Sequence, residues 1–134
     1  MRARLIVSAM VLVGLSGVGT YATTGHGVGP NRQWAVVNLV NPVQVSGNLL
    51  MGPYLIVHDD AKMARGEPCT TFYRFTPGKG PTEAAVSFHC KPAARPVATQ
   101  TTLTITTRPD TGMCKLTEYQ FPGEAEGHEV PDAR

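Results

Sequence analysis

The chain has 134 residues, of which 42% are hydrophobic and 16% are charged, and its formal net charge is +2. This length suits one domain with a single hydrophobic core. Arg2 and Arg4 belong to an N-terminal targeting segment, and without them the chain has ten basic and ten acidic residues, so no basic patch indicates nucleic-acid binding.

The first 22 residues have the three-part pattern of a secretory signal peptide. Arg2 and Arg4 precede an apolar run over 5–18, which small residues follow. This run is shorter than the roughly 20 apolar residues that cross a bilayer. We expect a signal peptide over 1–22, a secreted or periplasmic location and no stable membrane span after cleavage; retention as an anchor is the alternative. The Gly-rich residues 23–32 are expected to form a flexible leader.

Residues 33–121 have the pattern of an antiparallel β domain. Short runs rich in β-branched and aromatic residues alternate with glycine, proline and asparagine, which is typical of strands separated by turns. The main expected strands cover residues 34–40, 54–58, 70–76, 83–90, 97–107 and 113–121. We predict an all-β fold, a single antiparallel β-sandwich of immunoglobulin-like or cupredoxin-like shape. A disordered acidic tail is expected over 122–134.

Trp34, at the start of the first expected strand, is the only tryptophan of the chain. A large aromatic side chain in a strand commonly fills the core. The functional alternative is a platform on which a sugar or an aromatic ligand stacks. Trp34 is therefore a candidate ligand-stacking residue.

The stretch from Cys69 to Cys90 indicates one β-hairpin, because turn residues over 77–81 separate two strand-like runs. If Thr76 faces Glu83, then Cys69 faces Cys90 at the open end. The predicted core face then contains Thr71, Tyr73, Phe75, Ala84, Val86 and Phe88. Directly opposed cysteines in such a pair can form a disulfide, so we expect a Cys69–Cys90 bridge. Three reduced, buried cysteines are the alternative.

Cys114 remains as a free thiol if that bridge forms, because the chain has three cysteines. An odd cysteine in an exported protein is either buried or available for pairing between chains. A dimer through Cys114 is therefore one expectation for the oligomeric state.

The polar connection over 58–68 is the most chemically crowded segment, and it is longer than a hairpin needs. Its candidate metal ligands are His58, Asp59, Asp60 and Met63. The carboxylates would suit calcium, although the regular spacing of an EF-hand loop is absent. Without a metal, Asp59 or Asp60 would cap a short helical turn over 61–65 in a solvated connection.

A soft copper or haem site is a further hypothesis. It would combine His58 and Met63 with a third donor from Cys69, His89 or Cys90. The closely spaced Cys, His and Met near the C-terminal end of cupredoxins are absent, and so is a C-x-x-C-H haem attachment motif. We therefore expect no cofactor, with copper, calcium or haem as the alternative.

Motifs for catalysis are also absent: the chain has no G-x-S-x-G or H-E-x-x-H sequence and no phosphate-binding glycine loop before a helix. We therefore expect a protein that is not an enzyme.

Three stretches resemble a group of small secreted bacterial proteins of unknown function: VVNLVNPVQVSGNLLMGPYLIVHDD, MARGEPCTTFYRF and VSFHCKP. The resemblance implies export and a β fold, and it implies no catalytic activity. The sequence as a whole predicts an exported, non-catalytic module that binds an unidentified protein or envelope partner or has a structural role. The alternative is a small periplasmic metal-binding protein, for copper or haem, or a redox carrier.

Overall fold

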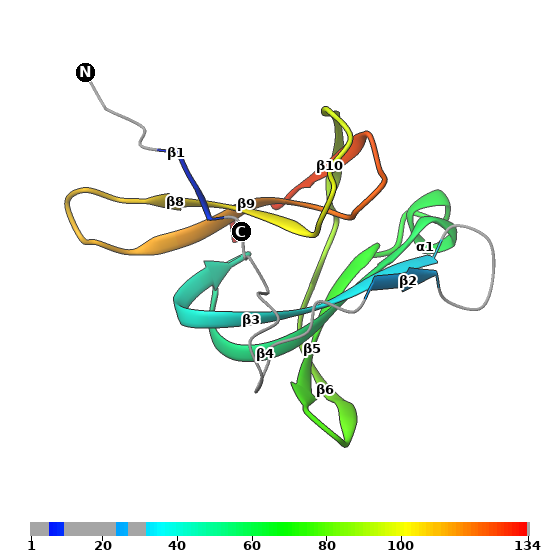
Figure 1. Cartoon of the computed structure of the whole chain (residues 1–134), viewed down its shortest axis with the longest axis horizontal. Coiled ribbons are helices and arrows are strands. Elements are labelled where there is room, and N and C mark those ends of the chain that lie inside the picture. Colours follow the sequence, from blue (N-terminus) through cyan, green and yellow to red (C-terminus); the bar gives the residue numbers. More distant parts are fainter. Residues whose placement is uncertain (1–5, 10–23, 27–31, 134) are drawn as a thin grey trace.

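A computed structural model of the chain describes residues 6–9, 24–26 and 32–133. These residues form ten strands and one short helix, so the prediction of a mostly β protein is confirmed (Figure 1). The elements are β1 (Ile6–Ala9), β2 (Thr24–His26), β3 (Arg32–Val45), β4 (Asn48–Asp59), α1 (Asp60–Ala64), β5 (Thr70–Thr76), β6 (Gly80–Phe88), β7 (Lys91–Ala94), β8 (Thr102–Thr107), β9 (Cys114–Gln120) and β10 (Glu126–Glu129).

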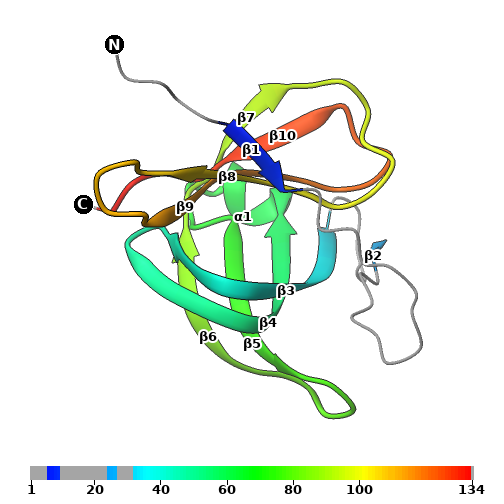
Figure 2. The ribbon, with the colours of Figure 1, turned by 60° about the vertical axis from the view of Figure 1, so that its left-hand side comes forward.

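The strands belong to one sheet with the main order β1-β8-β9-β3-β4-β5-β6. β3 and β9 pair in parallel, whereas the other recorded pairs are antiparallel. The sheet is therefore mixed, which differs from the purely antiparallel arrangement that was expected. β10 joins β7 to β9, and β2 pairs with β3. Figures 1 and 2 show β7 to β10 on one side of the molecule and β3 to β6 on the other.

One hydrophobic cluster joins both sides of the molecule. β3 contributes every second residue, Ala35, Val37 and Leu39, as the period of two in a strand requires. Phe72 of β5 lies near the centre, with its ring centroid 6.4 Å from that of Tyr119 on β9. Burial of these apolar side chains is the main favourable contribution to folding.

β3 and β4 form a long hairpin whose two-residue turn is Ser46-Gly47. Their φ angles of 45° and 82° belong to the left-handed region, which a type I′ turn requires at both positions. β4 begins six residues before the expected strand over 54–58 and continues through Gly52-Pro53. Gly52 has a φ of 97° beside an irregular stretch of the pairing with β3, and glycine adopts this backbone conformation without steric cost.

The predicted β5–β6 hairpin is confirmed, but the predicted register is wrong, by one residue at the open end and by three residues at Phe75 and Thr76. Val86 faces Phe72 instead of Tyr73, and Phe88 faces Thr70. The pairing is irregular on both sides of Tyr73. Consequently Thr70 and Phe72 are buried in the core, whereas Tyr73 is only half-buried. Both faces of β5 carry aromatic residues, so the hydrophobic pattern alone could not identify the core face.

Residues 122–134, which were expected to be disordered, contain β10. This strand lies between β7 and β9, and β7 lies outside the main expected strands. His128 and Val130 are 2% and 8% exposed. The Val130 N–H donates to the carbonyl oxygen of Thr117 at 2.9 Å. The tail is ordered because flanking strands satisfy its backbone groups, although its composition is polar.

β1 lies within the predicted signal peptide and pairs with β8, from Ile6 with Thr106 to Ala9 with Leu103. Cleavage after residue 22 would therefore remove one edge strand. The remainder of 1–22, and residues 23 and 27–31 of the predicted leader, lie outside the described residues. Within the part of the chain that the structure describes, no helix is long and apolar enough to cross a membrane. The signal peptide stays a prediction.

Candidate functional site

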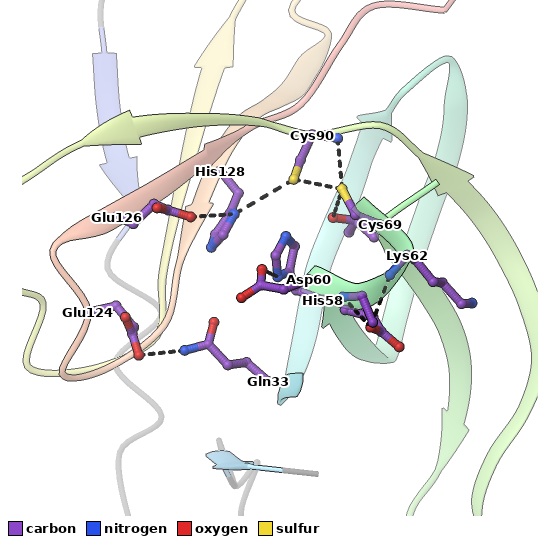
Figure 3. A network of polar contacts seen from close by, with 12 residues as sticks. Gln33, His58, Asp60, Lys62, Cys69, Cys90, Glu124, Glu126 and His128 are labelled. Atoms are coloured by element: carbon purple, nitrogen blue, oxygen red, sulfur yellow. Dashed lines mark hydrogen bonds and ion pairs between the residues drawn. The ribbon is translucent and has the colours of Figure 1, made fainter. Parts of the chain in front are cut away.

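Four side chains with sulfur or imidazole donors meet where β4, β5, β6 and β10 approach one another (Figure 3). His58 lies near the end of β4, and Cys69 directly precedes β5. Cys90 follows β6, and His128 lies in β10. We call these four residues the Cys–His cluster. Three of them come from the predicted hairpin and the connection before it, and the fourth comes from the C-terminal strand.

His58 points into the molecule because it shares a face of β4 with Tyr54 and Ile56. All three side chains are at most 1% exposed. The chain then leaves the strand in α1, which begins after Asp59. The Asp59 carboxylate accepts the backbone N–H groups of Ala61 and Lys62 at 2.9 and 3.3 Å. This confirms the predicted helical turn and its aspartate cap.

The two sulfur atoms of the cluster are in contact but not bonded. Cys69 Sγ lies 2.9 Å from Cys90 Sγ, and both cysteines are free thiols. The backbone N–H of Cys90 donates to Cys69 Sγ at 3.2 Å. The structure thus brings together the two residues of the predicted disulfide without forming it, and the bridge stays a prediction.

A ring nitrogen of His58 and the sulfur atoms of Cys69 and Cys90 all lie within 4.8 Å of one another. The Nδ1 atom of His58 is 3.3 Å from a carboxylate oxygen of Asp60. Its Nε2 atom is buried and has no hydrogen-bond partner. When the ring proton is on Nδ1, beside this carboxylate, Nε2 carries the free lone pair. A carboxylate that orients a histidine in this way is a common outer partner of metal-binding imidazoles.

His128 closes the other side of the cluster. Its ring centroid lies 4.3 Å from that of His58, and it stacks on Tyr119 at 4.8 Å. The Nδ1 atom is 3.7 Å from Cys90 Sγ and 3.9 Å from a carboxylate oxygen of Glu126. His128 therefore lies beside Cys90, whereas the donors within 4.8 Å of one another are those of His58, Cys69 and Cys90.

Burial determines the protonation states in the cluster. It lowers the pKa of His128 to about 4, and the neighbouring His58 adds to this effect. Burial also lowers the pKa of His58, although Asp60 and Asp59 oppose the shift. Desolvation and the hydrogen bond with Cys69 raise the pKa of Cys90 to about 12. At neutral pH the imidazoles are therefore uncharged, with free lone pairs, and the Cys90 sulfur is a thiol.

The sulfur separation decides what the site can do chemically. Two sulfurs bound tetrahedrally to one zinc ion lie about 3.8 Å apart, because Zn–S bonds are about 2.3 Å long. Two sulfurs in a disulfide lie about 2.05 Å apart. The observed 2.9 Å is within about 0.9 Å of both values. The two sulfurs would have to move apart to bind one zinc ion together, or closer to form a bridge.

The structure brings together only some of the candidate ligands that the sequence predicted. His58 belongs to the Cys–His cluster, and a carboxylate oxygen of Asp60 lies 3.3 Å from its Nδ1 atom. Asp59 caps α1 instead of facing the cluster donors. Met63 is a half-buried residue of α1 and is not required for a four-donor set. Cys114 lies apart on β9, where its sulfur is 3.7 Å from the Thr107 hydroxyl.

Sequence reasoning missed His128 as a cluster residue, because we placed it in a disordered tail. A weak signal was present, since residues at i and i+2 of a strand share a face. His128 and Val130 do share the buried face of the C-terminal segment. Two residues are too short a pattern to predict a strand from sequence.

Trp34 does not fill the core. It is half-buried and lines an open apolar cleft of about 450 Å³ together with Leu55, Val57 and Phe75. These residues lie on the face of β3 to β5 that points away from the hydrophobic core. The cleft is separate from the Cys–His cluster, and the stacking role of Trp34 stays a prediction.

Comparison of the chain with protein families, with curated proteins and with solved structures finds no match. The fold and the site therefore define the class of protein by themselves. The chain is a mostly β protein with two thiols and two imidazoles gathered in its interior.

Proposed function

We propose that the protein is an exported, non-catalytic binding module whose Cys–His cluster binds one soft, closed-shell metal ion, copper(I) or zinc. The observation that carries this proposal is the convergence of His58, Cys69 and Cys90. Their ligand atoms lie within 4.8 Å of one another, and His128 is beside them. A small metal-binding protein was the alternative function that the sequence predicted, but the ligands proposed here are a different set.

The donor chemistry favours a soft ion. Thiolate sulfur and imidazole nitrogen are the ligands that zinc and copper(I) prefer, whereas calcium is bound by oxygen. Asp59, which the calcium hypothesis needs, is engaged by the backbone of α1. The unpartnered Nε2 atom of His58 supports the proposal independently, because a buried nitrogen without a hydrogen bond destabilises the fold unless something binds it.

A site of two cysteines and two histidines would leave no open position on a four-coordinate ion. Zinc sites that are closed in this way are structural, whereas catalytic sites keep one position for water or substrate. Binding must also displace the thiol protons, so affinity is expected to rise with pH. These points support a binding or carrier role, as expected for a protein that is not an enzyme.

Metal titration of the reduced chain tests the proposal. Zinc and, under anaerobic conditions, copper(I) should each bind with one ion per chain, as counted by native mass spectrometry and competition with a chromophoric chelator. Binding should be lost or weakened by at least tenfold when one ligand is replaced, a typical cost at such sites. The test variants are Cys69→Ser, Cys90→Ser, His58→Gln and His128→Gln.

Two matched variants serve as controls. Cys114→Ser removes the thiol outside the cluster, and His89→Gln removes an exposed histidine. Both should bind the metal like the unmodified chain. Equal affinity of Cys69→Ser and the unmodified chain for both ions would refute the proposal.

We also propose that the two groups of strands pack as a β-sandwich in the exported, mature protein. One core shared by β3 to β6 and by β8 and β9 supports this arrangement. The apolar cleft at Trp34 supports contact with a partner or ligand on the outer face. Mass measurement of the protein from a secreted or periplasmic fraction tests export. The expected result is the mass of a chain that lacks residues 1–22.

A further inference from the structure

The two thiols of the Cys–His cluster differ in access. Cys69 is only 3% exposed, whereas Cys90 is half-buried at the end of β6. Behind Cys69, the Thr70 hydroxyl lies 3.8 Å from its sulfur and 2.5 Å from the hydroxyl of buried Tyr119. A reagent from solvent therefore reaches the pair from the side of Cys90.

We infer that the cysteine pair exchanges with organic disulfides, with Cys90 as the attacking thiol and Cys69 as the resolving thiol, and that the resulting bridge excludes the metal. The exclusion rests on the proposed function, but the exchange itself does not. The order of attack follows from the access of Cys90. The resolving role follows from the 2.9 Å between the two sulfur atoms.

The exchange is a two-step displacement. Cys90, whose pKa burial raises to about 12, first gives its proton to a base in the solvent, so the exchange is slow at neutral pH and faster at alkaline pH. The resulting thiolate attacks one sulfur of the organic disulfide, which forms a mixed disulfide and releases one thiolate. The Cys69 thiolate then attacks the Cys90 sulfur, which forms the Cys69–Cys90 bridge and releases the second thiolate. Two electrons pass from the protein thiols to the organic disulfide, and the two released thiolates accept the protons that the protein thiols lose.

The metal-bound protein gives the same products and releases the ion. Both sulfurs that would hold the ion are consumed by the bridge, so only His58 and His128 remain as donors. Two imidazoles without thiolates bind zinc or copper(I) far less tightly than the four-donor set. Oxidation therefore releases the metal, and reduction of the bridge restores the site.

Exchange is tested on the reduced, metal-free full chain with glutathione disulfide as the probe. All variants carry Cys114→Ser, which removes the thiol outside the cluster. The chain with both cluster cysteines should form a bridge and keep no adduct, as read by intact mass after acid quenching. Cys69→Ser should accumulate one glutathione adduct at Cys90. Cys90→Ser should form its adduct at least about tenfold more slowly, because Cys69 is buried.

A second measurement uses a chain that keeps both Cys69 and Cys90, so it does not depend on whether a variant of either residue folds. One equivalent of iodoacetamide, followed by peptide mapping, should label Cys90 before Cys69 in the chain that keeps both. In urea the two cysteines should be labelled equally. Faster labelling of Cys69 in the folded chain, or no bridge after treatment with glutathione disulfide, would overturn the inference.

Measurements with the metal distinguish the proposed metal binding from the inferred disulfide exchange. Zinc-loaded protein should release its ion to a chromophoric chelator in step with bridge formation, and retention of zinc by the bridged chain would overturn the exclusion. A reduced chain that binds neither zinc nor copper(I) would refute the proposed function. The mass assay on the metal-free chain would still decide the exchange.

Discussion

Acidification from pH 7 to pH 5 should destabilise the metal-free fold through the buried pair His58 and His128. Burial lowers the pKa of both rings, and that of His128 falls to about 4. An unfolded histidine has a pKa of about 6.5, so the unfolded chain takes up protons first as the pH falls. The stability from these uncharged rings is complete above pH 6.5 and is lost progressively below it.

The size of this loss of stability follows from the pKa of His128. Between pH 7 and pH 5, a change in pKa from 6.5 in the unfolded chain to about 4 in the folded chain lowers the free energy of unfolding by about 2 kcal/mol. His58 adds to this loss in the same direction. The carboxylates of Asp60 and Glu126 face the two rings at 3.3 and 3.9 Å and limit the total, because they favour the charged imidazoles.

Urea unfolding at pH 7, 6 and 5, with a chelator and a reductant present, measures this loss. The urea midpoint should fall by about 1 M between pH 7 and pH 5, given about 2 kcal/mol and an m-value of about 2 kcal/mol/M. His128→Gln should remove most of this pH dependence. The exposed His89 provides the control, and His89→Gln should keep all of it. A urea midpoint that does not change with pH would refute the reasoning. A midpoint of His128→Gln that falls with pH as steeply as that of the unmodified chain would also refute it.

Three substitutions test the packing around the site. Phe72→Ala should lower the free energy of unfolding by about 3–5 kcal/mol, because Phe72 is fully buried; a loss below about 1 kcal/mol in urea unfolding would contradict its central position. Tyr119→Phe should cost about 1–2 kcal/mol, since the Thr70 hydroxyl loses its partner at 2.5 Å, and zinc affinity should persist. Asp59→Ala should cost about 1 kcal/mol through the lost helix cap. Its zinc affinity should be unchanged, and a large decrease would make Asp59 a ligand.

Part of the site could be predicted from the sequence because it depends on local pairing. Cys69 and Cys90 flank the two strands of one hairpin, so they meet although the predicted register was wrong by one residue at the open end and by three near the turn. The period of two on β4 likewise places His58 on the buried face of Tyr54 and Ile56. That signal was present, although the interpretation of His58 as part of a solvated connection did not use it.

The rest of the site depends on pairing between distant parts of the chain. β10 pairs with β9 and β7, and the local signal of His128 and Val130 is too short to predict a strand there. His128 therefore reaches the cluster only through the topology of the sheet. The core face of β5 was also beyond prediction, because Phe72 and Tyr73 are adjacent aromatic residues and only tertiary packing selects the one that is buried.

X-ray absorption at the zinc edge of the reduced, zinc-loaded protein tests the central claim most directly, because it counts the ligand atoms around the ion. The Cys–His cluster predicts two sulfur atoms at about 2.3 Å and two nitrogen atoms at about 2.0–2.1 Å. A coordination shell made only of nitrogen and oxygen would contradict the account, since Cys69 and Cys90 would then not hold the metal.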